Sequence, residues 1–233
     1  MLKNKFILLV ALVLSCIFQL VSVCQNTTTY FENGFMIGLD KEYIGFGVLT
    51  SIVPLVFPVC FILFFTSGTI ENLMHGYGKV LIVRDYSKTL LILKRFLKNC
   101  LTIVCIVIFQ LLIFLLINNY LMHVESGMLK SLFMYFLILN ALVLMQCFLE
   151  MYIPAYIVNI LIFIYCSVSY YLVQMFFHST AAKLIMFPSL LFGMQNGAAS
   201  ADSSYYLYLA AAIIINLMLV TICIRRFKKI DIF

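Results

Sequence analysis

Six long uncharged stretches constrain the fold of this chain more than any other feature. Each is about 20 residues long, the length that an α-helix needs to cross a hydrocarbon core of about 30 Å. Hydrophobic residues make up 65% of the 233 positions and charged residues 10%, a composition far from that of a soluble domain. The sequence therefore predicts an all-α, polytopic membrane protein, a single transmembrane domain over 1–233, with six transmembrane helices at about 5–24, 45–66, 98–118, 129–149, 155–177 and 206–224.

The basic residues predict the orientation of these spans. Cytoplasmic loops of membrane proteins carry an excess of Lys and Arg. If both termini and the loop 67–97 are cytoplasmic, that side holds twelve of the 15 Lys and Arg: Lys3, Lys5, Lys79, Arg84, Lys88, Lys94, Arg95, Lys98, Arg225, Arg226, Lys228 and Lys229. We expect a multi-pass protein of the cell membrane with both termini in the cytoplasm. The net charge of +6 then reflects topology and contact with anionic lipid, rather than nucleic-acid binding.

The first window, 5–24, also resembles a signal sequence because a basic start precedes an apolar core. That core is longer than a usual signal core, and no small-x-small cleavage site follows it. We therefore expect residues 1–24 to be retained as a span. Cleavage is the alternative, and it would leave five spans with the N-terminus outside.

Patterns for chemistry are absent from the sequence. The motifs HExxH and GxSxG do not occur, and GYGK at 76–79 lacks the first glycine and the Ser or Thr of a phosphate loop. The eight cysteines lie in or beside the spans without a CxxC pair, which favours buried thiols over disulfides or metal. An intramembrane enzyme is thus a weak alternative, and the sequence predicts no catalytic residue, metal or cofactor in this chain.

The loop 67–97 is basic and amphipathic. Its apolar residues recur at helical spacing from Ile70 to Leu81, while Gly76 and Gly78 weaken the helix that this spacing predicts. Ser87 is a suitable cap for a second helix that leads into the third span. A basic amphipathic helix lying on anionic lipid is the simplest interpretation of such a segment.

The place of this loop, between the second and third of six spans, resembles the membrane subunit of type-2 ATP-binding-cassette (ABC) exporters. In that family a Glu near the end of span two precedes a Gly-containing coupling helix, a Ser-Arg turn and a basic residue before span three. Glu71, Gly76 with Gly78, Ser87-Lys88, and Lys94 stand at matching positions, while Arg84-Asp85 replaces a frequent Leu-Pro pair and Lys88 replaces Arg.

Two further features agree with this resemblance in outline. The segment EMYIP at 150–154 fits the short turn that the family has between spans four and five. The segment 178–205 fits the family's partly re-entrant outer segment before span six, since it is apolar but too short and Pro-broken to span.

The resemblance implies that a separate cytosolic ATPase subunit binds ATP and Mg and grips the coupling helix. It also implies a second membrane subunit, either another copy or a related chain. The residues that would dock the ATPase are Glu71, Leu73, Met74, Tyr77, Lys79, Leu81, Arg84, Asp85, Ser87 and Lys88. Spans two and five would face the shared cavity, where the candidate pathway residues are Pro54, Pro58, Asn159, Tyr165, Ser169, Tyr170 and Gln174.

The polar side chains of these spans have a simpler interpretation, because such groups commonly form hydrogen bonds between membrane helices. The same interpretation applies to Gln19, Gln110, Asn140, Gln146 and Asn216. No charged residue lies at mid-membrane, which argues against a proton-coupled transporter and suits an amphiphilic substrate: a peptide, lipid or drug. The resemblance associates such small bacterial subunits with peptide export or immunity to antimicrobial peptides. A non-transporting scaffold or sensor partner, whose loop binds lipid or another cytosolic protein, remains the alternative.

Overall fold

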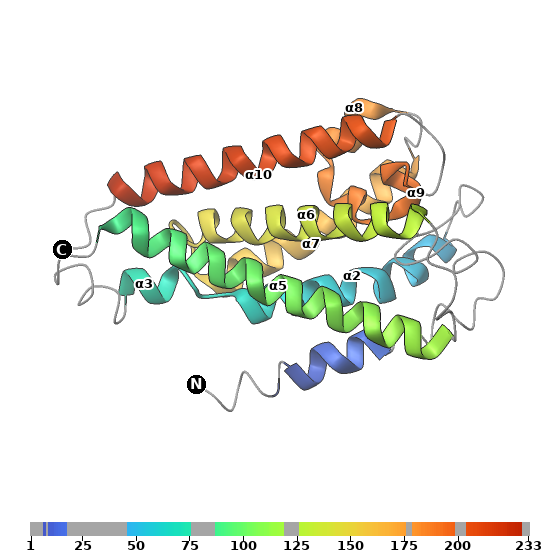
Figure 1. Ribbon diagram of the computed structural model, residues 1–233, viewed down its shortest axis with the longest axis horizontal. Helices are drawn as coiled ribbons and strands as arrows, with labels where there is room; N and C mark the ends of the chain where they lie inside the picture. Colours follow the sequence, from blue (N-terminus) through green and yellow to red (C-terminus); the bar gives the residue numbers. More distant parts are fainter. Residues whose placement is uncertain are drawn as a thin grey trace.

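The computed structural model describes residue 7 and residues 9–17, 46–75, 87–118, 126–175, 179–198 and 204–229, and these ranges contain helices and turns but no strand. Residues 9–17 are helical. The further elements, shown in Figure 1, are α2 (Phe46–Thr66), α3 (Glu71–His75), α5 (Lys88–Asn118), α6 (Ser126–Leu149), α7 (Ala155–Met175), α8 (Thr180–Ile185), the 3-10 helix η1 (Phe187–Leu191), α9 (Gly193–Asn196) and α10 (Ser204–Lys229). The prediction of an all-α fold is confirmed for these residues.

Four described segments are long and apolar enough to cross a membrane: Val56–Met74, Leu129–Leu149, Ala155–Val173 and Ser204–Lys229. They correspond to the second, fourth, fifth and sixth of the predicted spans. Large apolar side chains lie on the outside of these helices, as expected where lipid is the solvent; Leu217 of α10 is 62% exposed. The chain thus has helices suited to a membrane protein, while the total of six spans stays a prediction.

Helix α5 begins well before the predicted third span. Its 31 residues start at Lys88, ten positions earlier than the uncharged window. The Ser87 hydroxyl accepts a hydrogen bond from the backbone N–H of Leu90 at 3.4 Å, which confirms the prediction that Ser87 caps this helix. The basic second helix and the third span are therefore one continuous helix.

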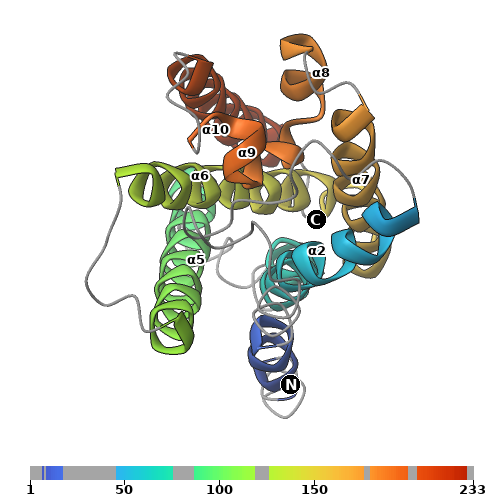
Figure 2. The same cartoon turned by 90° about the vertical axis from the view of Figure 1, so that its right-hand side faces the viewer.

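Helix α6 is the centre of the bundle. It contacts α2, α5, α7, η1, α9 and α10, and Figure 2 shows it between these neighbours. Its side chains Tyr135, Ile138 and Leu142 are completely buried. Asn140 of α6 donates a hydrogen bond to Asn216 of α10 at 2.9 Å, which confirms the predicted bonding between spans for this pair.

The predicted turn at 150–154 is also present. Helix α6 ends at Leu149 and α7 begins at Ala155, directly after Pro154. The carbonyl of Pro154 accepts the backbone N–H of Ile157 and Val158, so the proline lies at the start of the helix, where its lack of an N–H costs nothing. Helices α6 and α7 consequently run in opposite directions.

The segment before α10 folds into short helices that do not span. Ser179 caps α8 by accepting a hydrogen bond from the backbone N–H of Ala182, and Pro188 lies in the first turn of η1. Residues 187–191 are buried against α6 and α7. This agrees with the prediction of a segment that is apolar yet too short and broken to cross the membrane.

Candidate functional site

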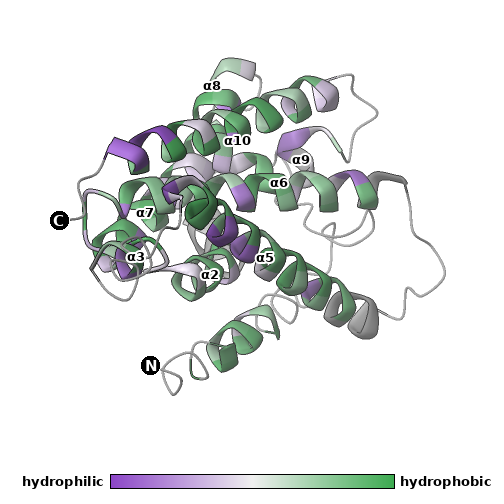
Figure 3. Cartoon of the chain, turned by 60° about the vertical axis from the view of Figure 1, so that its left-hand side comes forward, coloured by the Kyte–Doolittle hydropathy of each residue, from purple (hydrophilic) through white to green (hydrophobic). Residues whose placement is uncertain are grey.

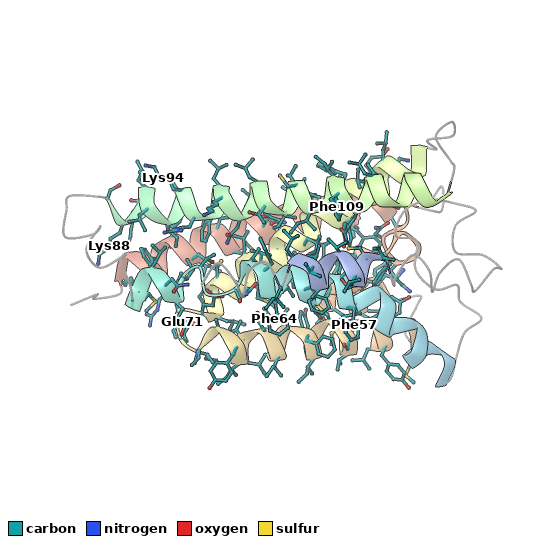
Figure 4. The ribbon with its side chains drawn as sticks, turned by 90° about the horizontal axis from the view of Figure 1, so that it is seen from below. Phe57, Phe64, Glu71, Lys88, Lys94 and Phe109 are labelled. Carbon is teal, nitrogen blue, oxygen red and sulfur yellow. The ribbon has the colours of Figure 1, made fainter. Side chains whose placement is uncertain are left out.

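Basic residues gather at one end of the bundle, together with α3. Figure 1 places α3, the start of α5, the α6–α7 turn and the end of α10 at this end, and α8 and α9 at the other. We call them the α3 end and the α8 end. Arg226, Lys228 and Lys229 occupy the last turn of α10, and Figure 3 shows hydrophilic residues at this end of the helix. In Figure 4 Glu71 and Lys88 lie at the same end.

A buried carboxylate, Glu150, links the α6–α7 turn to the segment that joins α2 and α3. Its side chain is 4% exposed. One carboxylate oxygen accepts the backbone N–H of Gly68 at 2.8 Å, and the other accepts that of Ile70 at 3.1 Å. These two N–H groups precede α3 and have no helical partner of their own, and Glu150 satisfies them across 82 and 80 positions of sequence.

A second carboxylate makes the reciprocal contact. Glu71, the first residue of α3, accepts the backbone N–H of Ala155 at 3.2 Å. Ala155 is the first residue of α7, whose free N–H groups favour a negative charge. We call Glu71, Glu150 and the backbone N–H groups of Gly68, Ile70 and Ala155 the carboxylate latch.

Gln146 extends the carboxylate latch into the long apolar helices. Its amide nitrogen donates to the carbonyl of Leu63 at 3.0 Å, to Asn159 at 3.0 Å and to Glu150 at 3.2 Å. Its amide oxygen accepts the hydroxyl of Thr66 at 3.2 Å. A single buried side chain therefore joins α2, α6 and α7 directly below the latch.

Burial dominates the electrostatics of Glu150. Desolvation raises the pKa of its carboxyl above the ordinary value, although the backbone N–H groups of Gly68 and Ile70 and the Gln146 amide favour the charged form. The carboxyl thus holds its proton more tightly than a solvated Glu does. Its hydrogen-bond partners are neutral groups.

Helix α5 joins the same region through weaker contacts. The amide of Asn99 donates to the hydroxyl of Thr69 at 3.4 Å and to the sulfur of Cys147 at 3.6 Å. Thr69 lies between Gly68 and Ile70, whose N–H groups bind Glu150. The short α2–α3 connection is consequently held by α5, α6 and the α6–α7 turn together.

The predicted docking residues fall into three groups. Glu71 belongs to the carboxylate latch, and Ser87 caps α5 beside the half-buried Lys88. Leu73 is only 1% exposed, which differs from the expectation that it faces a partner: a five-residue helix buries its apolar side on the nearest bundle. Met74 is half-buried against the same core. Tyr77, Lys79, Leu81, Arg84 and Asp85 lie outside the described residues.

The predicted pathway residues of α7 contact other parts of this chain. Asn159 binds Gln146, the Tyr165 hydroxyl donates to the carbonyl of Ile185 at 2.8 Å, and Ser169 lies 3.5 Å from the sulfur of Met186. The Tyr170 ring packs edge-on against the Phe192 ring, with 4.7 Å between the ring centres. Pro54 and Pro58 lie in α2, where Pro58 is buried, and Gln174 lies near the end of α7.

The described residues contain no group of three His, Cys, Asp or Glu that could hold a metal ion. Seven cysteines are in this part of the chain, all with free thiols, and five of them are buried: Cys16, Cys60, Cys147, Cys166 and Cys223. Cys24 lies outside the described residues. The expectation of unpaired, mainly buried thiols is confirmed for these seven.

Sequence reasoning found the turn at 150–154 but missed the role of its acid. Glu150 entered the prediction only as the first residue of the EMYIP turn. A signal was present, because a carboxylate between two apolar spans needs hydrogen-bond donors, and the backbone N–H groups just before a predicted helix at 70–81 have no partner within that helix. Nothing in the sequence indicates that Glu71 binds the start of α7.

A curated relative and a family model each match nearly the whole chain. The "Uncharacterized protein YybK" of Bacillus subtilis (strain 168) is 25% identical over 247 residues, which cover 98% of this chain and 96% of that protein. No solved structure matches the chain. A family model described as "Protein of unknown function (DUF2705)" matches residues 12–233, and the chain therefore belongs to the DUF2705 family.

Proposed function

We propose that this chain is the membrane-spanning subunit of an ABC transporter of the cell membrane, driven by a separate cytosolic ATPase. The observation that carries the proposal is the setting of α3. This short helix between α2 and α5 is hydrogen-bonded through the carboxylate latch to the α6–α7 turn. Such an element is suited to receiving force from a partner and passing it to several helices.

Buried apolar side chains and hydrogen bonds hold the α3 end together. Ile70 and Leu73 anchor α3 in the core, and Glu71 and Glu150 bond it to the adjoining turn. A displacement of α3 then moves the end of α2 and the start of α7 with it, since hydrogen bonds from backbone N–H groups to carboxylates resist separation. ATP-driven closure of a partner would in this way tilt the spans around a substrate pathway.

The charges of the α3 end favour an acidic partner surface. Arg225, Arg226, Lys228 and Lys229 are exposed at the end of α10, and Lys94 and Lys98 are exposed on α5. The Arg226 guanidinium lies 4.9 Å from the centre of the Tyr152 ring, so the basic end of α10 reaches the α6–α7 turn. Under the proposal, six spans place both termini and this surface in the cytoplasm.

A transport pathway requires a second bundle, which we propose to be another copy or a related chain. Helix α7 offers a broad apolar surface for a membrane-embedded interface, with Tyr156 65% exposed and Ile160 53% exposed. The polar groups of α7 that contact η1 and α8 would line the pathway after these elements move. An amphiphilic peptide, lipid or drug fits such neutral, aromatic surroundings.

One observation favours the alternative of a non-transporting scaffold. Leu73, the expected apolar anchor for a partner, is buried in this chain's own core. A scaffold or sensor partner would use the basic α3 end to bind anionic lipid or a different cytosolic protein, without ATP-driven motion.

Copurification from the native membrane in detergent, followed by an ATPase assay, distinguishes these functions. Tyr77→Asp and Arg84→Glu are expected to remove a copurifying ATPase and transport. Thr221→Ser, on the exposed surface of α10, is the matched control that should retain both. If both loop variants keep the ATPase bound and transport intact, the docking proposal fails.

Cysteine labelling tests the proposed orientation independently. Lys88→Cys should be shielded from an impermeant reagent outside the cell, and Ser203→Cys should react with it. The opposite pattern would reverse the topology and remove the cytoplasmic docking surface.

A further inference from the structure

We infer that Glu150 and Glu71 are positioning residues: the carboxylate latch makes the α2–α3 connection and the start of α7 move as one body. This inference deepens the proposed function and rests on it for its consequence in transport. The physical linkage itself is a property of this chain and can be measured without any partner.

The α2–α3 connection with α3 and the α6–α7 turn bind each other reciprocally. Glu150, which follows α6, binds N–H groups that precede α3, while Glu71, which begins α3, binds the first N–H of α7. Each segment thus supplies a carboxylate to the other segment's free donors. Separation of the two segments would break three hydrogen bonds at once and leave the buried Glu150 without backbone donors.

The backbone conformation of the α2–α3 connection suits the latch. Gly68 has a φ of 72°, in the left-handed region that favours glycine. A Cβ atom at this position would also come within 3.2 Å of the side-chain nitrogen of Asn72. This conformation presents the N–H groups of Gly68 and Ile70 to the two oxygens of one carboxylate, so glycine is favoured at the position where the latch needs a left-handed φ.

A buried amide inside the bundle holds Glu150 in place. Gln146 binds Glu150 as well as Leu63 of α2 and Asn159 of α7, and all of these contacts are buried. The carboxylate therefore cannot shift toward α3 without straining bonds to both neighbouring helices. A load on α3 reaches α7 by two routes, directly through Glu71 and indirectly through Glu150 and Gln146.

Hydrogen exchange of the purified chain in lipid nanodiscs tests the linkage. Glu150→Ala removes an acceptor from the backbone N–H groups of Gly68 and Ile70 and from the Gln146 amide, but it leaves Glu71, the acceptor of Ala155, in place. A shared body nevertheless predicts that exchange also accelerates at Ala155. We expect about tenfold faster exchange in both segments, the effect of losing a buried acceptor. Glu150→Gln keeps one of the two acceptor oxygens and should rescue part of the protection.

Asn216→Ala is the matched control, because it removes a buried polar link between α6 and α10 far from the latch. It should leave exchange at residues 68–75 and 155–158 unchanged. Faster exchange at Gly68 and Ile70 with no change at Ala155 in Glu150→Ala would overturn the inference, since the two segments would then open independently.

The transport arm uses the chain with its copurified ATPase. Glu150→Ala should retain the ATPase while the substrate moved per ATP falls by about tenfold or more, and Glu150→Gln should restore the ratio in part. If no ATPase copurifies with the wild type, the proposed function fails while the exchange result still decides the linkage. Normal transport per ATP in Glu150→Ala would overturn the positioning role even though the chain is a transporter subunit.

Discussion

The segment 180–198 and the carboxylate latch join distant parts of the chain in opposite ways. In the segment, polar side chains bond close by: Asn196 donates to the carbonyl of Leu190 and accepts the N–H of Ala198. Its attachment to α7 relies largely on rings, with Phe187 against Tyr165 and Phe192 against Tyr170. In the latch, polar bonds connect residues 80 to 84 positions apart.

This difference shows what each end of the bundle is suited to do. Ring packing is insensitive to charge and holds the α8 end by shape. The latch depends on a few directional bonds and responds to the protonation of a buried carboxyl, whose pKa burial raises. The α3 end is therefore the region where a small chemical change, or a partner's pull, has a directional mechanical effect.

Phe192→Ala should cause the largest loss of stability. The side chain is 1% exposed, and its removal leaves a cavity against Tyr170, so we expect a loss of about 3–5 kcal/mol. Reversible unfolding in mixed micelles provides the measurement, and Phe192→Leu should recover part of the loss. A change below about 0.5 kcal/mol would mean that packing does not hold the α8 end.

Glu150→Ala should destabilise the chain by about 2–3 kcal/mol, because it leaves the buried N–H groups of Gly68 and Ile70 without acceptors. The same unfolding assay measures it, with Glu150→Gln as the matched variant that keeps an acceptor. An unchanged midpoint for Glu150→Ala would show that solvent replaces the carboxylate, and the contrast between the two regions would disappear.

Most of the fold that lies in the described residues could be predicted from hydropathy and turn chemistry. The uncharged windows gave the centres of α2, α5, α6, α7 and α10, and Pro154 marked the start of α7. The beginning of α5 at Lys88 followed from Ser87 as a cap. These signals are local, and a helix in lipid must satisfy its backbone within the helix, so local signals suffice.

The carboxylate latch could not be predicted because it is a tertiary feature. A sequence pattern gives the face of a helix but not which neighbour approaches it, so Leu73 was expected on a partner surface and lies in the core. Likewise, the acids at 71 and 150 gain their roles only when α3 meets the α6–α7 turn. Asn140 and Asn216 were easier, since an amide inside a span needs a partner on another helix.

Gly68→Ala should sharpen the comparison with an intermediate effect. A left-handed φ of 72° costs an alanine about 1–2 kcal/mol, and the new Cβ would crowd Asn72. Unfolding in micelles measures the loss. Gly197→Ala provides the counterpart at the α8 end, where φ is 77°. If only the Gly68 variant also loosens the start of α7 in hydrogen exchange, the mechanical role belongs to the latch.

The pH dependence of unfolding should separate the two regions further. Burial raises the pKa of the Glu150 carboxyl, so the native state binds this proton more tightly than the unfolded chain. The stability contributed is fully present below the unfolded pKa of about 4.3 and is lost as pH rises through the raised value. Unfolding midpoints across this range should fall in the wild type and in Phe192→Ala but not in Glu150→Gln. A slope retained in Glu150→Gln would assign the titration to another group.

Tyr165→Phe should have the smallest effect, because it removes one polar bond and leaves the packing intact. The Tyr165 hydroxyl donates to the carbonyl of Ile185 at 2.8 Å, while its ring packs against Phe187 at 5.8 Å. Side-chain bonds between membrane helices contribute about 0.6 kcal/mol, so we expect a loss near that value and no change in the pH slope. Tyr165→Ala, which also removes the ring, should lose several times more in the same unfolding assay. If the two variants were equal, the hydroxyl rather than the ring would hold segment 180–198 to α7, and both regions would depend on directional bonds.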